Sequence, residues 1–356
     1  MALAAHSSAT APDDGLGYRS AMIHRPHLAL TAALVLVVAA CSTTGGSTGA
    51  PPSVAPTAGG SAATACPATP APAQDAIEAW SPASQDPTIY PQIINPPGSI
   101  ACGPTRFMFS FLDASNVPIA APDRTVTLGL YDLGADPETP VVTTDGTFIW
   151  AIEDAVGVYV ADIDFPTSGL WGVEFTTAAA DAAPETIRVQ FEVQPESSVV
   201  AVGERAPASD TPTLADVDGD VSKISTDPEP VEAFYETSVA DALAAGEPFV
   251  LAFATPKFCT TAQCGPTLER LKPIAAAHPD ITFINVEPYE LELVDGQLQP
   301  VLTGDPAQLT PAPATTEWRL SAEPWIFVVD GNGVVTASFM LIFSDDELTS
   351  ALTALE

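Results

Sequence analysis

Short segments of alternating apolar and polar residues fill the middle of the chain. Apolar side chains recur at every second position in these segments, and residues typical of turns separate them. The predicted strands cover residues 106–112, 124–131, 148–151, 157–161, 169–175 and 186–193. Several short strands at this spacing, without helical periodicity, predict an all-β antiparallel sandwich over residues 98–195.

Helical and strand patterns alternate in the last third of the chain. In chain order they are a helix over 238–246, a strand over 249–253, a helix over 266–278 and a strand over 281–286. Strands over 325–329 and 334–343 follow, and a last helix begins with a capping box at 344–347. We expect Ser238 to cap the first helix and Gly246 to end it. Residues 288–316 are predicted to be irregular. This order predicts a mixed α/β sheet with a parallel core and a hairpin edge over residues 231–356.

Two segments rich in proline and small residues have no apolar periodicity. Residues 41–97 are expected to form a disordered tether rich in Pro, Gly, Ser and Thr, and the acidic segment 196–230 is expected to form a linker. The chain is therefore predicted to hold two folded domains, one on each side of the linker.

An apolar stretch near the N-terminus has the form of a secretion signal. Cationic residues within 24–27 precede the apolar stretch 28–40, which is too short to span a membrane comfortably. Residues 38–41, Val-Ala-Ala-Cys, resemble the lipobox of bacterial lipoproteins, which implies cleavage before Cys41 and acylation of its thiol, for example with palmitate. We therefore expect residues 1–40 to be an N-terminal extension with a lipoprotein signal peptide. The alternative is an uncleaved anchor.

Charge limits the classes of partner. The 356 residues include 45 Asp and Glu but only 11 Lys and Arg, so the formal net charge is −34. Such acidity argues against nucleic acid as a partner and against electrostatic docking on anionic lipid. Attachment is therefore expected through the lipid on Cys41, at the extracytoplasmic face of the cell membrane. No haem, phosphate-loop or zinc motif occurs, so we expect no cofactor and no bound metal.

Four further cysteines would lie in that compartment, where disulfides persist. They are Cys66, Cys102, Cys259 and Cys264. We expect Cys66 and Cys102 to form a structural disulfide between the tether and the sandwich. Four cysteines nevertheless allow three pairings, and the sequence does not choose among them.

The surroundings of Cys259 resemble those of the thioredoxin redox pair. A buried strand leads to Cys259-Thr-Thr-Ala-Gln-Cys264, and a later stretch, residues 318–325, resembles the segment that carries the cis-proline of thioredoxins. The resemblance covers about residues 230–356 and implies a thioredoxin-like α/β fold and a cis bond before Pro324. It also implies thiol–disulfide exchange with extracytoplasmic protein thiols or disulfides. The residues assigned to the substrate groove are Phe258, Glu323 and Trp325.

The pair departs from the thioredoxin pattern by having four residues between its cysteines instead of two. In a regular helix the two Cα atoms would lie roughly 8.6 Å apart, beyond the reach of a disulfide. Pro266 favours a helix that begins near Cys264 and leaves Cys259 in the loop. Counting from the strand makes Cys259 the attacking sulfur, which we prefer, whereas alignment of Cys264-Gly-Pro-Thr with Cys-Gly-Pro-Cys makes Cys264 the attacker. Lys257 is a candidate for lowering a thiol pKa.

A further departure concerns the buried acid that thioredoxins keep near the resolving cysteine. The strand 249–253 contains no acidic residue, which puts efficient reductase turnover in doubt.

Other readings remain open. A non-catalytic envelope-binding lipoprotein would use both disulfides only to brace its fold. The segment 255–264 also resembles peroxiredoxins with this cysteine spacing, although Pro256 stands where they carry threonine. Copper delivery of the Sco type lacks its histidine. The sandwich has the size of an immunoglobulin-like domain and resembles small extracytoplasmic modules of the copper-resistance and YtkA-like type, without their copper ligands.

Overall fold

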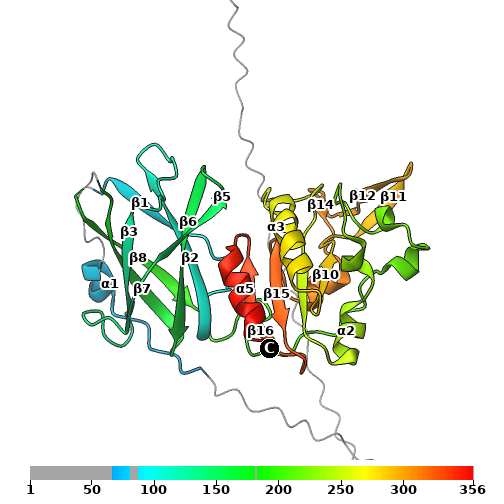
Figure 1. Ribbon diagram of the computed structural model, residues 1–356. Coiled ribbons are helices and arrows are strands. Elements are labelled where there is room, and N and C mark those ends of the chain that lie inside the picture. The colour runs from blue at the N-terminus through cyan, green and yellow to red at the C-terminus, as the bar shows by residue number, and fades with distance from the viewer. Residues whose placement is uncertain (1–65, 81–86, 181–182, 356) are drawn as a thin grey trace, which may run out of the picture. The chain divides into compact units, whose positions relative to one another are not determined.

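The computed structural model describes residues 66–80, 87–180 and 183–355. The predicted signal peptide, the lipidation site Cys41 and most of the predicted tether lie outside these residues. Within the described part of the chain, none of the helices combines the length and apolar character needed to cross a bilayer. The described residues form a β-rich part and a mixed α/β part (Figure 1).

The β-rich part consists of two four-stranded antiparallel sheets, with strand orders β1-β2-β6-β5 and β4-β3-β7-β8. The strands are β1 (Ile89–Ile93), β2 (Gly103–Asp113), β3 (Thr125–Asp132), β4 (Val142–Asp145), β5 (Thr147–Ile152), β6 (Val156–Phe165), β7 (Gly169–Ala178) and β8 (Glu185–Val193). Aromatic side chains from both sheets, among them Phe109 of β2 and Phe175 of β7, pack into one core with ring centroids 4.8 Å apart. This is the sandwich arrangement that the alternating pattern predicts.

Part of the predicted tether belongs to this sandwich. Helix α1 (Gln74–Trp80) places Trp80 in a buried position, where its ring lies 4.4 Å from that of Tyr131. Strand β1 pairs with β2, and a disulfide joins Cys66 to Cys102, with Cα atoms 6.1 Å apart. The domain therefore begins well before residue 98. The sequence analysis missed these elements because a short helix and an edge strand carry little periodic signal. The segment that contains them is also rich in proline.

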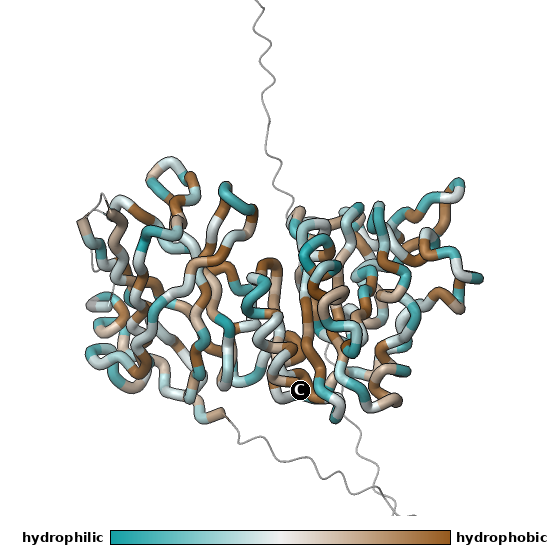
Figure 2. Tube along the Cα trace, viewed as in Figure 1, coloured by the Kyte–Doolittle hydropathy of each residue, from teal (hydrophilic) through white to brown (hydrophobic). Residues whose placement is uncertain are grey.

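The C-terminal sheet has the strand order β10-β9-β15-β16. Strands β9 (Phe249–Phe253) and β10 (Thr282–Val286) are parallel, whereas β15 (Trp325–Val329) is antiparallel to both β9 and β16 (Val335–Met340). Side chains of β9 alternate between two cores. Val250 and Ala252 pack with helices α3 (Cys264–Ala277) and α5 (Asp345–Thr353), while Leu251 and Phe253 pack on the opposite face. Apolar residues concentrate in these strands (Figure 2).

Residues 288–316 are less irregular than predicted. They form two short hairpins, β11 (Leu291–Val294) with β12 (Gln297–Pro300) and β13 (Leu302–Thr303) with β14 (Gln308–Leu309), followed by α4 (Pro313–Glu317). Their strands are mostly exposed on both faces, so they lack the apolar alternation by which buried strands are recognised.

The segment predicted as a linker, residues 196–230, is held against the C-terminal sheet. The Gly203 amide donates to the Val335 carbonyl, and the Val335 amide donates to the Glu204 carbonyl. Three short 3-10 turns follow, at Leu214–Val217, Val221–Lys223 and Glu232–Tyr235. The C-terminal unit therefore extends upstream of residue 231. Backbone hydrogen bonds of this kind leave no hydrophobic pattern in the sequence.

Helix α2 (Val239–Ala245) begins and ends where its sequence predicts. The Ser238 hydroxyl accepts a hydrogen bond from the Asp241 amide, and Gly246 adopts the left-handed conformation with φ of 69°. Ser238→Ala should lower the free energy of unfolding by about 1 kcal/mol, because the Asp241 amide loses its hydrogen bond to the buried Ser238 side chain. Chemical denaturation would measure this loss. Ser350→Ala, at an exposed position of α5, is the control and should change stability far less. Equal losses in the two variants would contradict a capping role.

Candidate redox site

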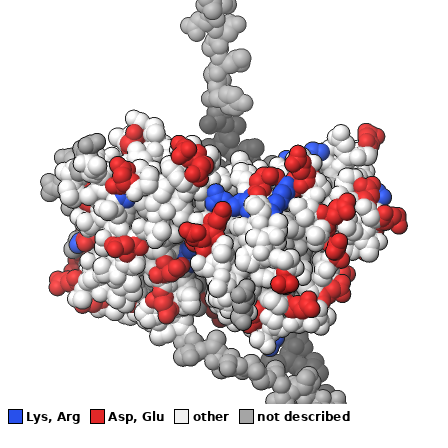
Figure 3. Space-filling view, viewed as in Figure 1, with Lys and Arg blue, Asp and Glu red and all other residues white. Residues whose placement is uncertain are grey.

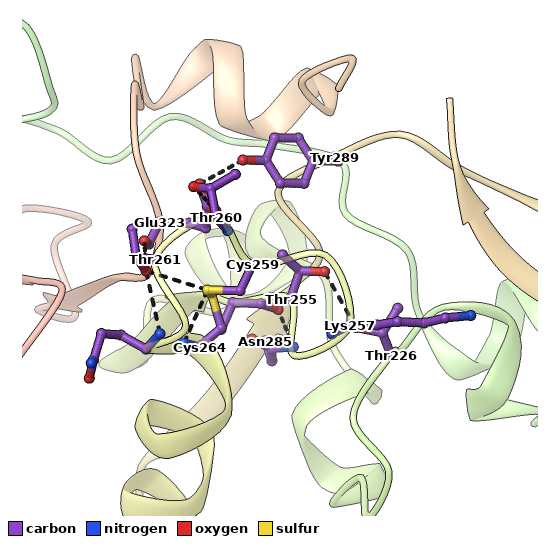
Figure 4. The surroundings of a disulfide bond; sticks show 12 residues. Thr226, Thr255, Lys257, Cys259, Thr260, Thr261, Cys264, Asn285, Tyr289 and Glu323 are labelled. Carbon is purple, nitrogen blue, oxygen red and sulfur yellow. Dashed lines mark hydrogen bonds between the residues drawn. A yellow bond between two sulfur atoms is a disulfide. The ribbon is translucent and has the colours of Figure 1, made fainter. Parts of the chain in front are cut away.

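The two C-terminal cysteines are joined in a disulfide at the start of helix α3 (Figure 4). Cys259 lies in the loop after β9, and Cys264 is the first residue of α3. Their Cα atoms are 6.0 Å apart, which is within the usual range for a disulfide and shorter than a regular helix would allow. The helix begins two residues before Pro266, so the loop conformation brings the sulfurs together as the sequence argument required.

The two sulfurs differ in their surroundings. Cys264 is fully buried, with 0% of its surface exposed, whereas Cys259 is only partly buried. The backbone amide of Cys264 donates to Cys259 Sγ over 3.2 Å, and the Thr261 hydroxyl lies 3.4 Å from the same sulfur. Donors at a helix N-terminus stabilise a thiolate. The geometry therefore favours Cys259 as the attacking sulfur and Cys264 as the resolving one.

The Glu323–Pro324 peptide bond is cis, as we expected. It brings the backbone carbonyl of Glu323 to the loop between β9 and α3, here called the cysteine loop, where the Thr261 hydroxyl donates to it over 2.8 Å. Pro324 thus adjoins the pair, directly before β15. A second cis bond, Asp305–Pro306, lies in the turn between β13 and β14 and was not predicted.

Glu323, which the sequence analysis assigned to the substrate groove, also contributes its side chain to the site. Its carboxylate is 3% exposed, and one oxygen accepts hydrogen bonds from the amide and the hydroxyl of Thr260, each over 2.7 Å. The other oxygen accepts a hydrogen bond from the Tyr289 hydroxyl over 2.6 Å. Burial and the adjacent carboxylate raise the pKa of Tyr289, so its hydroxyl stays protonated and donates. A carboxylate oxygen of Glu323 and the two cysteine sulfurs all lie within 4.8 Å of one another.

Other residues assigned to the site are placed differently. Trp325 is buried in β15 and stacks on Phe327 with ring centroids 5.6 Å apart, so its ring packs in the core. Phe258 is partly buried beside Cys259. Lys257 Nζ donates to the carbonyl of Leu298 and points away from the sulfurs, so it is not placed to lower a cysteine pKa (Figure 4).

A buried acid does lie next to Thr255, in the segment that leads from β9 to Cys259, but it comes from the neighbouring strand. Glu287 follows β10, and its carboxylate accepts hydrogen bonds from the Thr226 amide over 2.6 Å and from the Thr255 hydroxyl. Burial raises the pKa of Glu287 to about 7. Because β9 and β10 are parallel, their carboxyl ends meet at one edge of the sheet. This pairing is the feature from which the position of Glu287 near the end of β9 could have been predicted. Thr255 itself is fully buried, and its hydroxyl is taken up by the hydrogen bond to Glu287.

Polar groups extend behind Glu287. The Asn285 side-chain amide donates to the Tyr235 hydroxyl over 2.9 Å and lies 3.4 Å from the Ala254 carbonyl. Burial raises the pKa of Tyr235 to about 12. One oxygen of Glu287 and the side-chain oxygen of Asn285 have no partner among the described residues.

On the surface, acidic side chains are scattered over the face drawn in Figure 3.

Comparisons with known proteins give little further information. No known protein family matches the chain, and no protein with a curated description matches it. One similar solved structure is described as "Structure of MTB dsbF in its mixed oxidized and reduced forms". It is 26% identical over 31% of this chain and 82% of that chain. The TM-score is 0.23, and a likeness of that quality carries no argument about fold or function.

Proposed function

We propose that the C-terminal domain is thioredoxin-like and exchanges thiols and disulfides through Cys259 and Cys264. The observation that carries this proposal is the unequal environment of the two sulfurs. Cys259 is only partly buried and its sulfur accepts a hydrogen bond from the Cys264 amide, whereas Cys264 is fully buried. The cis bond before Pro324 adds a backbone surface next to the pair. A disulfide that only braced the fold would not need this asymmetry.

The exchange proceeds in two steps that conserve electrons. The Cys259 thiolate attacks one sulfur of a partner disulfide, a mixed disulfide forms, and the first partner sulfur leaves as a thiolate that takes up a proton. The Cys264 thiol then loses its proton and attacks Cys259, which releases the second partner sulfur. The protein loses two electrons and the partner gains them. The opposite direction runs through the same mixed disulfide, and reduction potentials set the balance.

We place this activity at the extracytoplasmic face of the cell membrane, with the lipid on Cys41 as the anchor. The lipobox-like residues 38–41 support this placement, as does the net charge of −34, which makes attachment through anionic lipid headgroups unfavourable. The partners would be thiols or disulfides of proteins in that compartment.

Cys264→Ser should convert the site into a trap. The variant keeps the attacking sulfur but lacks the resolving one, so incubation with glutathione disulfide should leave a stable glutathione adduct on Cys259. Intact-mass measurement and peptide mapping would detect the adduct. The wild-type chain, first reduced and then given the same reagent, should close its own disulfide and accumulate little adduct.

The trapping experiment also separates the two main functional hypotheses. A Cys264→Ser chain that stays folded and forms no adduct would refute exchange and leave a binding scaffold with structural disulfides. The assigned roles would be reversed if the Cys259→Ser variant formed an adduct on Cys264 while the Cys264→Ser variant formed none on Cys259.

A further inference from the structure

Three ligand atoms of a kind that binds metal converge at the redox site. Cys259 Sγ, Cys264 Sγ and a carboxylate oxygen of Glu323 lie within 4.8 Å of one another. They come from two segments, the start of helix α3 and the residue before Pro324, so the chain fold and not local sequence brings them together. Figure 4 shows the carboxylate of Glu323 beside the cysteine loop.

Opening the disulfide creates an electrostatic problem at this position. Reduction yields two thiols, and ionisation of either one places negative charge close to a carboxylate that is 3% exposed. Glu323 takes part in none of the ion pairs formed by the described residues, and Lys257, the basic residue of the loop, is bound to a backbone carbonyl elsewhere. Buried like charges are costly unless a cation compensates them.

Hydrogen bonds fix the carboxylate of Glu323 in one orientation, as outer partners do for the side chains that bind a metal. Three hydrogen bonds, two from Thr260 and one from Tyr289, fix the orientation of Glu323. Partners of this outer kind orient a ligand and tune its basicity. The backbone of Glu323 is fixed as well, because its carbonyl accepts a hydrogen bond from Thr261.

The three ligand atoms are close enough for a tetrahedral ion once the disulfide is open. Zn–S bonds of about 2.3 Å and Zn–O bonds of about 2.1 Å separate two ligands by roughly 3.6 to 3.8 Å. The sulfurs have to move apart from their bonded positions to reach this separation, and a Cα separation of 6.0 Å leaves room for that movement. Two thiolates with one carboxylate suit the borderline-soft Zn²⁺, whereas Cu(I) prefers sulfur alone and Ca²⁺ or Mg²⁺ prefers oxygen alone.

From this geometry we infer that the reduced protein binds one Zn²⁺ through Cys259, Cys264 and Glu323, with the fourth position open to water or to a partner thiol. Binding displaces the two thiol protons and consumes no electrons. The bound ion holds the pair in its reduced form, since neither sulfur is then free to reoxidise. The inference rests on the same cysteine pair as the proposed function, but it requires only that a chemical reductant can open the disulfide.

The experiment titrates Zn²⁺ into the full chain against a chromophoric chelator. The protein is first reduced with a water-soluble phosphine, which becomes a phosphine oxide as the disulfide takes up two electrons and two protons. Because Cys66 and Cys102 also offer thiols under these conditions, the Cys259→Ser chain gives the background. We expect one additional equivalent in the wild-type chain, an affinity at least about 10-fold lower in Glu323→Gln, and no change in Glu290→Gln. Glu290 is an exposed acid of the neighbouring loop, so its variant removes the same charge.

Two outcomes would overturn the inference. One is the absence of an equivalent beyond the Cys259→Ser background. The other is an unchanged affinity in a folded Glu323→Gln chain, which would mean that the cysteines capture zinc without the carboxylate. Exchange with glutathione, measured separately in the presence of a chelator, keeps the two ideas apart. Exchange without zinc binding refutes only the metal site, and zinc binding without exchange refutes only the proposed function.

Discussion

Replacing Cys259 with serine is expected to abolish thiol–disulfide exchange, whereas replacing Cys264 should leave the first half of the reaction intact. Cys259 is the less buried of the two cysteines, and the Cys264 amide is placed to stabilise a thiolate on its sulfur. A serine hydroxyl cannot form the mixed disulfide, so no residual route remains through this position. The buried Cys264 sulfur has 0% exposure and no direct access to a partner.

Reduction of a small aromatic disulfide by the pre-reduced chain, followed by absorbance, measures this loss. The Cys259→Ser chain should match a control in which both cysteines are serine. The Cys264→Ser chain should release one equivalent of product thiol beyond that control and then stop. Full activity in Cys259→Ser, or a burst confined to that variant, would transfer the attacking role to Cys264, as the Cys-Gly-Pro reading of residues 264–266 implies.

Regular periodic patterns made the two folded parts predictable. Strand β9 is five consecutive apolar residues bounded by turn signals, and β2 and β7 carry aromatic residues that fill one core. The ends of the domains were predictable only in part. Trp80 contacts Tyr131 across some fifty residues of chain, and Gly203 bonds to Val335 through backbone groups alone. Neither contact leaves a local pattern in the sequence.

The redox site was predictable where its chemistry is local and not where it depends on tertiary contacts. Cys259, Cys264 and the cis bond before Pro324 follow from short motifs. The positions of the two buried carboxylates do not follow from such motifs. Glu323 precedes a proline some sixty residues away from the cysteines, and Glu287 follows the adjacent parallel strand. The packing of Trp325 in the core was not predictable for a related reason. Strand alternation turns its ring towards Phe327, and the motif alone does not reveal this direction.

Glu287 should make the folded protein less stable as the pH rises from about 4.5 to about 7. Burial raises the pKa of this carboxyl from an ordinary value of 4.5 to about 7 in the folded state. A group that binds its proton more tightly when folded contributes stability below its unfolded pKa, and that contribution is lost as the pH rises through its folded pKa. The shift corresponds to about 3 kcal/mol for a group with 8% exposure.

Glu287→Gln should remove this slope, because a neutral amide of the same shape cannot ionise and still accepts from the Thr226 amide. Denaturant unfolding at pH 5 and at pH 8 would measure the free energy in each chain. The other acidic groups contribute to both chains, so the difference between wild type and variant isolates Glu287. Glu290→Gln is the matched control and should keep the wild-type slope, since its carboxylate is exposed. Parallel pH profiles for the wild-type and Glu287→Gln chains would show that Glu287 is ionised in the folded protein across this range.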